Sequence, residues 1–269
     1  MNRVRALGDG QGAGIVQGGP GDDARPEARS AWGTGRWHWL GRVPFARTAA
    51  LQDVLRARVV DNRLPETLLL LEHDPVITLG RNADFGNVLH TEASLAARGV
   101  SLHQASRGGD VTYHGPGQLV GYPIFHLRAG VRAHVEGMAT AIAVVLAEIG
   151  VTARYRREAP GLWVQTPEAA GAGESKIESK ICAFGVKVHR RVTTHGFALN
   201  LDPDLEAFRL IVPCGLPGGH VTSVARLRGS SPSAGELAAR VAAAFGTHLK
   251  VAFEEGDASI LNCNTEADP

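Results

Sequence analysis

Cysteine and lysine are both scarce in this chain of 269 residues, which has three cysteines and four lysines. The cysteines are Cys182, Cys214 and Cys263. Their spacing matches no zinc pattern of paired cysteines, and an odd count is a poor disulfide framework. We therefore expect free thiols in a reducing compartment, which indicates a cytoplasmic protein. The sequence implies no metal site.

Long apolar runs and a strong charge of one sign are also lacking. No segment is long and apolar enough to cross a bilayer, and residues 1–30 lack the apolar core of an export signal. The formal net charge is only +1, so no global basic field points to nucleic acid. We expect a soluble protein with neither a membrane nor a nucleic acid as partner.

Hydrophobic residues make up 44% of the chain, enough for a real core, but they are unevenly distributed. Residues 1–35 are rich in glycine and poor in large apolar side chains, which predicts a disordered N-terminal extension. Residues 36–252 are expected to form a single domain, and residues 253–269 a frayed C-terminal tail. Within the domain, the Gly- and Glu-rich stretch 166–179 predicts a mobile hairpin insertion.

Apolar periodicity predicts a mixture of strands and helices without a regular βαβ rhythm. Apolar residues at helical spacing predict helices over 45–63 and 131–149, the second followed by a capping glycine, Gly150. A capping box of Ser233 and Glu236 opens a third helix that reaches about Leu249. Strands are expected over 37–45, 67–73, 76–81, 101–106, 118–127, 161–164, 180–190 and 193–201. The class is α/β (α+β), with a mixed, partly antiparallel sheet and packed helices.

Glycine is abundant in the segment RGGDVTYHGPGQLVGYP, which runs from Arg107 to Pro123. We expect a loop from Arg107 to Gly117. Its backbone N–H groups could hold a carbonyl or oxyanion, or the glycines could simply make a tight connection. The segment matches neither GxGxxG nor the P-loop, since it lacks the required lysine. A nucleotide phosphate site is therefore disfavoured.

Cys214 differs from the other two cysteines in its surroundings. It lies in VPCGLPGGHVTSV, where the prolines and glycines exclude a regular helix or a central strand. A thiol on such a loop can be exposed and reactive, whereas Cys182 sits in an apolar strand and fits a buried hydrophobe. Cys263 lies in the polar tail, with no apparent supporting residues.

Lys180 stands immediately before the apolar strand ICAFGV, so its ammonium could project toward a cleft. A lysine beside a cysteine favours the thiolate, although an ordinary strand-edge lysine is the plainer interpretation. Several histidines lie in or beside the same loops and offer another base for Cys214, or loop-ordering hydrogen bonds. They are His73, His114, His195 and His220.

Taken together, three segments resemble the lipoyl(octanoyl) transferase family: RGGDVTYHGPGQLVGYP, KICAFGVKVHRRVTTHGFALNLDPDL and VPCGLPGGHVTSV, with LEHDPVITLGR as further support. The resemblance covers the chain from about Trp37 to Leu249 and makes 36–252 the octanoyltransferase catalytic domain. It implies a fold similar to the biotin and lipoate protein ligase catalytic domains.

The resemblance also implies a catalytic dyad of Cys214, in the family's PCG motif, and Lys180, which opens its K-I-x-A-x-G motif. The family's acyl pocket implies the substrate-binding residues Arg107, Gly108, Gly109, Asp110, Val111, Thr112, Tyr113, His114, Ala183, Phe184, Gly185, His195, Gly196, Phe197 and Ala198. The chain departs from the family in its long N-terminal extension and in Leu216, which stands where an aromatic residue is common. A second lysine, in ESKIE, also precedes Lys180 in ESKIC.

The expected reaction moves an octanoyl (lipoyl) group from octanoyl-acyl carrier protein, through a Cys214 acyl-enzyme, to the lysine of a lipoyl domain. Such domains belong to 2-oxoacid dehydrogenase subunits and to the glycine cleavage H protein. The thioester is already activated, so no cofactor is expected. The alternatives are an ATP-dependent lipoate or biotin protein ligase and a non-catalytic small-molecule-binding module. Because acyl carrier proteins are acidic, we expect a basic rim formed by Arg154, Arg156 and Arg157 or by Lys187, His189, Arg190 and Arg191, unless these side chains form only a solvated face.

Overall fold

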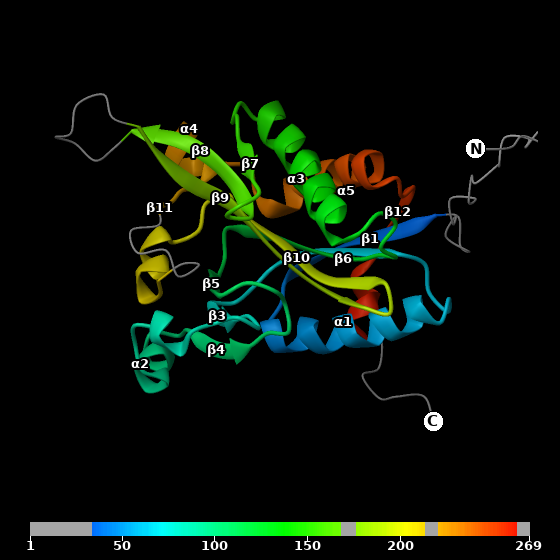
Figure 1. The fold of residues 1–269 in the computed structure, drawn as a ribbon, viewed down its shortest axis with the longest axis horizontal. Helices are drawn as coiled ribbons and strands as arrows, with labels where there is room; N and C mark the ends of the chain where they lie inside the picture. The colour runs from blue at the N-terminus through cyan, green and yellow to red at the C-terminus, as the bar shows by residue number, and fades with distance from the viewer. Residues whose placement is uncertain (1–33, 168–175, 213–219, 263–269) are drawn as a thin grey trace, which may run out of the picture.

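The computed structural model describes residues 34–167, 176–212 and 220–262. A large mixed sheet runs through the middle of the molecule (Figure 1). In spatial order its strands are β12 (Phe253–Gly256), β1 (Gly35–Arg42), β2 (Thr67–Glu72), β6 (Gln118–Ile124), β10 (Val192–Asn200), β9 (Lys176–His189), β8 (Gly161–Pro167) and β7 (Arg154–Arg156). Strand β1 is parallel to β12 and β2, and the pairs from β2 to β7 are antiparallel. The short strand β11 (His220–Val221) pairs in parallel with β9.

Helices cover both faces of this sheet. Figure 1 shows α3 (Val131–Glu148) and α5 (Ala234–Leu249) on one face and α1 (Phe45–Val60) on the other. The four leucines of β2 divide between these layers because neighbouring side chains of a strand point to opposite faces. Leu68 and Leu70 pack in the core with α3 and α5, whereas Leu69 and Leu71 pack with α1. A strand buried on both faces therefore has a continuous apolar sequence.

The helix boundaries follow from local chemistry. Pro44 is the N-cap of α1, where its lack of an N–H costs nothing. Gly150 follows the C-cap of α3 with φ of +74°, as the sequence predicts for a terminating glycine. Ser233 and Glu236 form the predicted capping box of α5, each side chain bonding the other's backbone N–H. The predictions for Gly150 and for the capping box are confirmed.

A smaller sheet packs beside the first, in the order β4 (Ser101–Gln104), β3 (Val76–Leu79) and β5 (Val111–His114). The helix α2 (Glu92–Ala97) and two short 3-10 segments, η1 (Phe85–Asn87) and η2 (Leu205–Leu210), complete this region. Strand β5 corrects the sequence prediction, which placed a loop over residues 107–117. Val111 and Tyr113 alternate into the apolar core of the small sheet, and that burial forms a strand despite the flanking glycines.

Two other predictions need correction. The hairpin of β8 and β9 is present, but β9 already begins at Lys176, so 176–179 belong to the sheet and not to an insertion over 166–179. The predicted tail from residue 253 contributes β12, whose residues pair with Gly35 to His38 of β1. Residues 1–33, 168–175, 213–219 and 263–269 lie outside the described residues, and with them Cys214 and Cys263. Within the described ranges, no helix combines the length and apolarity needed to cross a membrane.

Candidate active site

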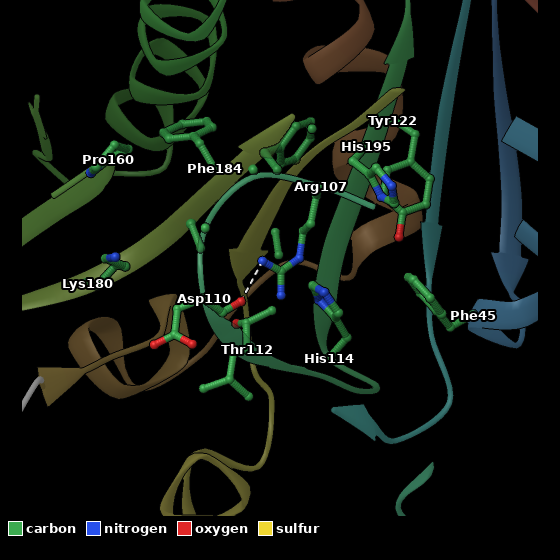
Figure 2. A pocket seen from close by; sticks show the side chains of 17 residues that line it. Phe45, Arg107, Asp110, Thr112, His114, Tyr122, Pro160, Lys180, Phe184 and His195 are labelled. Carbon is green, nitrogen blue, oxygen red and sulfur yellow. Dashed lines mark hydrogen bonds between the residues drawn. The ribbon is translucent and has the colours of Figure 1, made fainter. Parts of the chain in front are cut away.

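A pocket opens between the β9–β10 hairpin and the segment that joins the two sheets through β5. It encloses about 570 Å³ of space not filled by atoms, including the part open to solvent. In the view of Figure 2, Lys180 and Pro160 lie at one end, Arg107 lies in the middle, and Tyr122 and Phe45 lie at the other end. The pocket therefore extends from the Lys180 amine, past Arg107, to the aromatic side chains of Tyr122 and Phe45.

One wall of the pocket consists of small residues on two paired strands. In the register of β9 and β10, Ala183 lies opposite Ala198 and Gly185 lies opposite Gly196. The absence of a side chain at Gly185 lets Arg107 pass over β9, because a Cβ there would lie 3.1 Å from Arg107 Cδ. The two glycines thus let Arg107 and the backbone of β6 approach the hairpin closely.

Lys180 is buried at the end of the pocket, with 8% of its surface exposed. Its Nζ lies 4.9 Å from the centre of the Trp163 ring, the distance of a cation–π contact. Gly161 makes room for the lysine stem, since a Cβ at that position would lie 2.9 Å from Lys180 Cε. The Trp163 contact contributes about 0.5–2 kcal/mol in favour of the charged amine. The local sequence therefore places an ammonium group at the pocket.

Arg107 organises the glycine-rich segment from inside. Its Nη1 donates to the carbonyl oxygens of Asp110 at 2.8 Å and Gly108 at 3.1 Å, and Nη2 donates to Thr78 O at 2.7 Å. The bond to Asp110 is the dashed line in Figure 2. The Gly108 N–H donates to Val186 O at 3.0 Å and is therefore already engaged. The guanidinium fixes the shape of this wall and contributes to the pocket lining.

Three histidines and a tyrosine gather at the far end of the pocket. His73 accepts a hydrogen bond from the Tyr122 hydroxyl at 2.6 Å and donates to Val43 O at 2.7 Å. Burial lowers the pKa of His73 and of His195 from 6.5 to about 4, and it holds the pKa of His114 well below its ordinary value. These imidazoles are therefore neutral at pH 7. In the described part of the chain, no group of three or more His, Cys, Asp or Glu residues is placed to hold a metal ion.

His195 occupies an unusual backbone position. Its φ is +56°, although it lies within a strand and is not glycine. Its N–H donates to Gln52 Oε1 of α1 at 2.7 Å, and its Nε2 lies 3.2 Å from Ser106 Oγ. A left-handed residue in a strand costs about 1–2 kcal/mol and persists where its surroundings fix it. The strain orients an imidazole at the pocket wall.

The structure brings most of the predicted pocket residues together. The lining contains the predicted residues Arg107, Gly109, Asp110, Val111, Thr112, His114, Lys180, Ala183, Phe184, Gly185, His195, Gly196, Phe197 and Ala198. Gly108 and Tyr113 are not among the lining residues, and the Tyr113 ring instead packs edge-on against Phe208 at 5.5 Å. Phe45, Tyr122 and Pro160 also line the pocket and were not predicted. Tyr122 lies within the glycine-rich segment Arg107–Pro123, so that segment could have predicted it as a pocket residue.

The described residues on both sides of the segment 213–219 are held by backbone hydrogen bonds near the pocket. Val212 N–H donates to Asn87 O at 2.8 Å, and Val221 pairs with Lys180 in the parallel ladder of β11 and β9. Cys214 is two positions from Val212 in the sequence. Cys182, by contrast, is fully buried in the main core, and burial raises the pKa of its thiol. The interpretation of Cys182 as a buried hydrophobe agrees with this position.

Comparison with known proteins identifies the family of this fold and pocket. Residues 44–246 match the model of the lipoyl protein ligase A/B catalytic domain. The chain belongs to that family. An octanoyltransferase from Chloroflexus aurantiacus is 44% identical over 213 residues, which cover 78% of this chain and 91% of the relative. An octanoyltransferase from Acidobacterium capsulatum is 45% identical over 195 residues, covering 69% of this chain and 77% of the relative.

Solved structures of the lipoyl protein ligase A/B type have the same fold. A bipartite lipoate protein ligase from Thermoplasma acidophilum aligns with a TM-score of 0.63, 16% identity, and coverage of 85% of this chain and 91% of that one. A lipoate-protein ligase A bound with ATP has the same TM-score and identity and covers 93% of its chain. At this identity the likeness establishes the fold alone. The predicted fold class, a mixed sheet with packed helices similar to lipoate ligases, is confirmed.

Proposed function

We propose that this protein is an acyltransferase that moves octanoyl groups onto the lysine of lipoyl domains, with Cys214 as nucleophile and Lys180 as acid and base. The similarity to octanoyltransferases over most of the chain supports the reaction. The observation that carries the assignment of residues is the pairing of β11 with β9, which brings the chain that follows Cys214 alongside Lys180.

The proposed reaction has two acyl transfers. The Cys214 thiolate attacks the thioester carbonyl of the donor, and the carbon–sulfur bond to the carrier breaks as Lys180 gives its proton to the departing thiol. The amine of the acceptor lysine then attacks the acyl-enzyme, gives a proton to Lys180, and releases the Cys214 thiolate. Both steps exchange groups on an activated acyl carbon. The cycle therefore needs no ATP and no cofactor.

The pocket suits an unbranched apolar chain. Ala183, Ala198 and the paired glycines offer a wall without polar side chains, and Phe184 and Phe197 add aromatic surface. Each buried methylene contributes about 0.8 kcal/mol, so a pocket of fixed depth discriminates among chain lengths. The neutral histidines beside Tyr122 present no net charge to the acyl chain.

We propose an acyl carrier protein as the donor, and the arginines of β7 and the residue after it as its contact. Arg154 lies opposite Trp163, which lies opposite Lys180, so β7 is two strands from the lysine. Arg154 and Arg156 pair with Glu178, and Arg157 pairs with Glu136. The pairs of the exposed Arg154 and Arg157 are worth only about 0–1 kcal/mol, so an acidic partner can replace them. Arg190 belongs to the other group of basic residues named above. It is ten strand positions from Lys180, a distance of about 33 Å.

Acceptors under this proposal are the lipoyl domains of 2-oxoacid dehydrogenase subunits and the glycine cleavage H protein. A nucleophilic thiol must stay reduced, so we place the reaction in the cytoplasm. Arg154→Glu and Arg157→Glu should raise KM for the carrier protein and weaken its dependence on salt, whereas Arg190→Glu should change neither. Equal effects at both positions would remove this docking assignment.

The decisive experiment measures the intact mass of the protein after mixing with octanoyl-acyl carrier protein in the absence of ATP. Wild type, Cys214→Ala and Cys182→Ala are compared side by side. An octanoyl mass that disappears only in Cys214→Ala establishes the acyl-enzyme at that residue. A mass retained in Cys214→Ala would refute the assignment of the nucleophile.

Two further variants separate the candidate bases. Lys180→Ala should slow formation of the acyl-enzyme by about 10²–10⁴-fold, the usual contribution of a general acid or base. His220→Ala, on β11 and exposed, should leave the rate within about twofold if the histidine alternative is wrong. The ligase alternative predicts octanoylation of a lipoyl domain from free octanoate that requires ATP, and transfer from the carrier thioester without ATP contradicts it.

A further inference from the structure

A buried chain of hydrogen bonds links the pocket to the backbone of Lys180. His114 Nδ1–H donates to Gln118 Oε1 at 3.1 Å, and Gln118 Nε2 donates to Asn200 Oδ1 at 3.0 Å. Asn200 Nδ2 then donates to the carbonyl oxygen of Thr222 at 3.0 Å. The Thr222 N–H completes the chain by donating to the carbonyl oxygen of Lys180 at 3.0 Å.

The direction of every donor in this chain is fixed. Thr222 offers Asn200 a carbonyl oxygen, so the Asn200 amide nitrogen must face it and Oδ1 must face Gln118. Gln118 Nε2 also donates to Tyr113 O at 3.2 Å, which leaves Gln118 Oε1 for His114. His114 therefore carries its proton on Nδ1, and Nε2 is the acceptor nitrogen.

Burial makes this chain costly unless it is complete. The exposed fractions are 1% for Gln118, 5% for Asn200 and 1% for Thr222. Buried amides that lose a partner retain their full desolvation cost, so the four bonds hold their elements together as a set. The elements are β5, β6, β10, β9 and the chain that follows β11. Strand β5 carries the pocket residue His114, and the chain after β11 follows the segment that contains Cys214.

We infer that Gln118 and Asn200 are positioning residues that hold the chain after Cys214 against the Lys180 strand, an inference that rests on the proposed function. Strand β11 has only two residues, and its pairing with β9 lies off the main path of the sheet. The Asn200 side chain ties the end of this short ladder to β10, next to the backbone hydrogen bond from Ala225 N–H to Leu201 O at 2.9 Å. Loosening this tie would free the chain that follows Cys214 from the strand that carries Lys180, and under the proposed function these two segments act together.

The test compares Asn200→Leu and Asn200→Asp with Thr193→Val in the full chain. Leucine removes both hydrogen bonds, whereas aspartate keeps the acceptor for Gln118 and loses only the donor to Thr222. Thr193 is the matched control because it is also fully buried on β10 and donates to Pro123 O at 2.7 Å, far along the strand from Thr222. All three changes should lower the melting temperature.

Three readouts are needed: the rate of octanoyl adduct formation at saturating donor, KM for the donor, and the pH dependence of Cys214 alkylation by iodoacetamide, followed by peptide mass. Both Asn200 variants should lose about tenfold or more in rate, the scale expected when reacting groups are misplaced by less than 1 Å, with KM within twofold. The apparent pKa of Cys214 alkylation should rise toward about 8.5, the value of an isolated thiol. Thr193→Val should keep the wild-type rate and alkylation profile.

An Asn200→Asp protein that is folded, destabilised like the control and unchanged in rate and alkylation profile overturns the inference, because the chain would then be structural only. If Asn200→Leu does not fold, Asn200→Asp alone decides the question. A wild-type protein that forms no adduct at Cys214 and is alkylated there like a free thiol overturns the proposed function instead. The two failures are therefore distinguishable.

Discussion

Acidification should destabilise this protein through its buried histidines. Burial lowers the pKa of His73, His134 and His195 from 6.5 to about 4. Between these values the unfolded chain binds three protons that the folded protein does not, so stability is fully present above pH 6.5 and falls as the pH falls. Each histidine contributes about 1.4 kcal/mol per pH unit in this window. From pH 7 to 5.5 the three together lower the free energy of unfolding by about 4 kcal/mol, and His114 and His38, whose pKa values burial also lowers, add to this decrease.

Urea denaturation followed by tryptophan fluorescence between pH 7 and 5.5 measures this dependence. His134→Leu should remove less than one third of the slope, because His38 and His114 also contribute to it. His134 lies on α3 with its Nε2 unpartnered among the described residues and its ring edge-on to Phe125. The pKa values of Glu158, Glu236 and Asp257 are already lowered by their hydrogen bonds, so these carboxylates do not titrate in this window. An unfolding free energy that is flat from pH 7 to 5.5 would refute the reasoning.

Two substitutions test the packing around the pocket. Gly121→Ala should destabilise the fold by about 1–3 kcal/mol and change the preference for acyl-chain length, because its Cβ would lie 2.0 Å from the pocket-lining ring of Phe197. Chemical denaturation and competition between octanoyl and hexanoyl donors check both effects; unchanged stability and chain preference would contradict them. Cys182→Ala should retain full adduct formation, and native Cys182 should resist iodoacetamide, because burial raises the pKa of its thiol. Rapid native alkylation of Cys182 would contradict its placement.

The sequence predicted best where local chemistry and periodicity agree. The capping box at Ser233 and the glycine after α3 fixed two helix boundaries, and the apolar run from Leu68 to Leu71 indicated a strand buried on both faces. It failed at β5 and β12, whose formation depends on distant partners. Val111 and Tyr113 form a strand only because β3 and the small apolar core lie beside them. Glycine content alone pointed to a loop there.

The pocket residues likewise divide into those that sequence motifs predict and those that only tertiary packing brings to the pocket. Residues of the glycine-rich segment and of the β9–β10 hairpin were found from motifs, because the motifs encode those strands directly. Phe45 and Pro160 lie outside every motif and reach the pocket only through the packing of α1 and the turn before β8. The hydrogen bond from Asn200 to Thr222 joins residues 22 positions apart, and nothing in the sequence around either residue predicts it. Tertiary contacts of this kind require the fold.

The register of β9 supports Lys180 over Lys176 as the proposed catalytic amine, a choice that the repeated ESKI sequence leaves open. Lys176 pairs with Pro167 at the end of the hairpin, whereas Lys180 pairs with Trp163 and Val221 and lines the pocket. Four strand positions separate their Cα atoms by about 13 Å, so the two residues lie at different places along the hairpin. Lys176→Ala should therefore keep the rate of adduct formation within about twofold, whereas Lys180→Ala should lose about 10²–10⁴-fold. A large loss in Lys176→Ala with normal folding would show that the catalytic amine has been assigned to the wrong end of the strand.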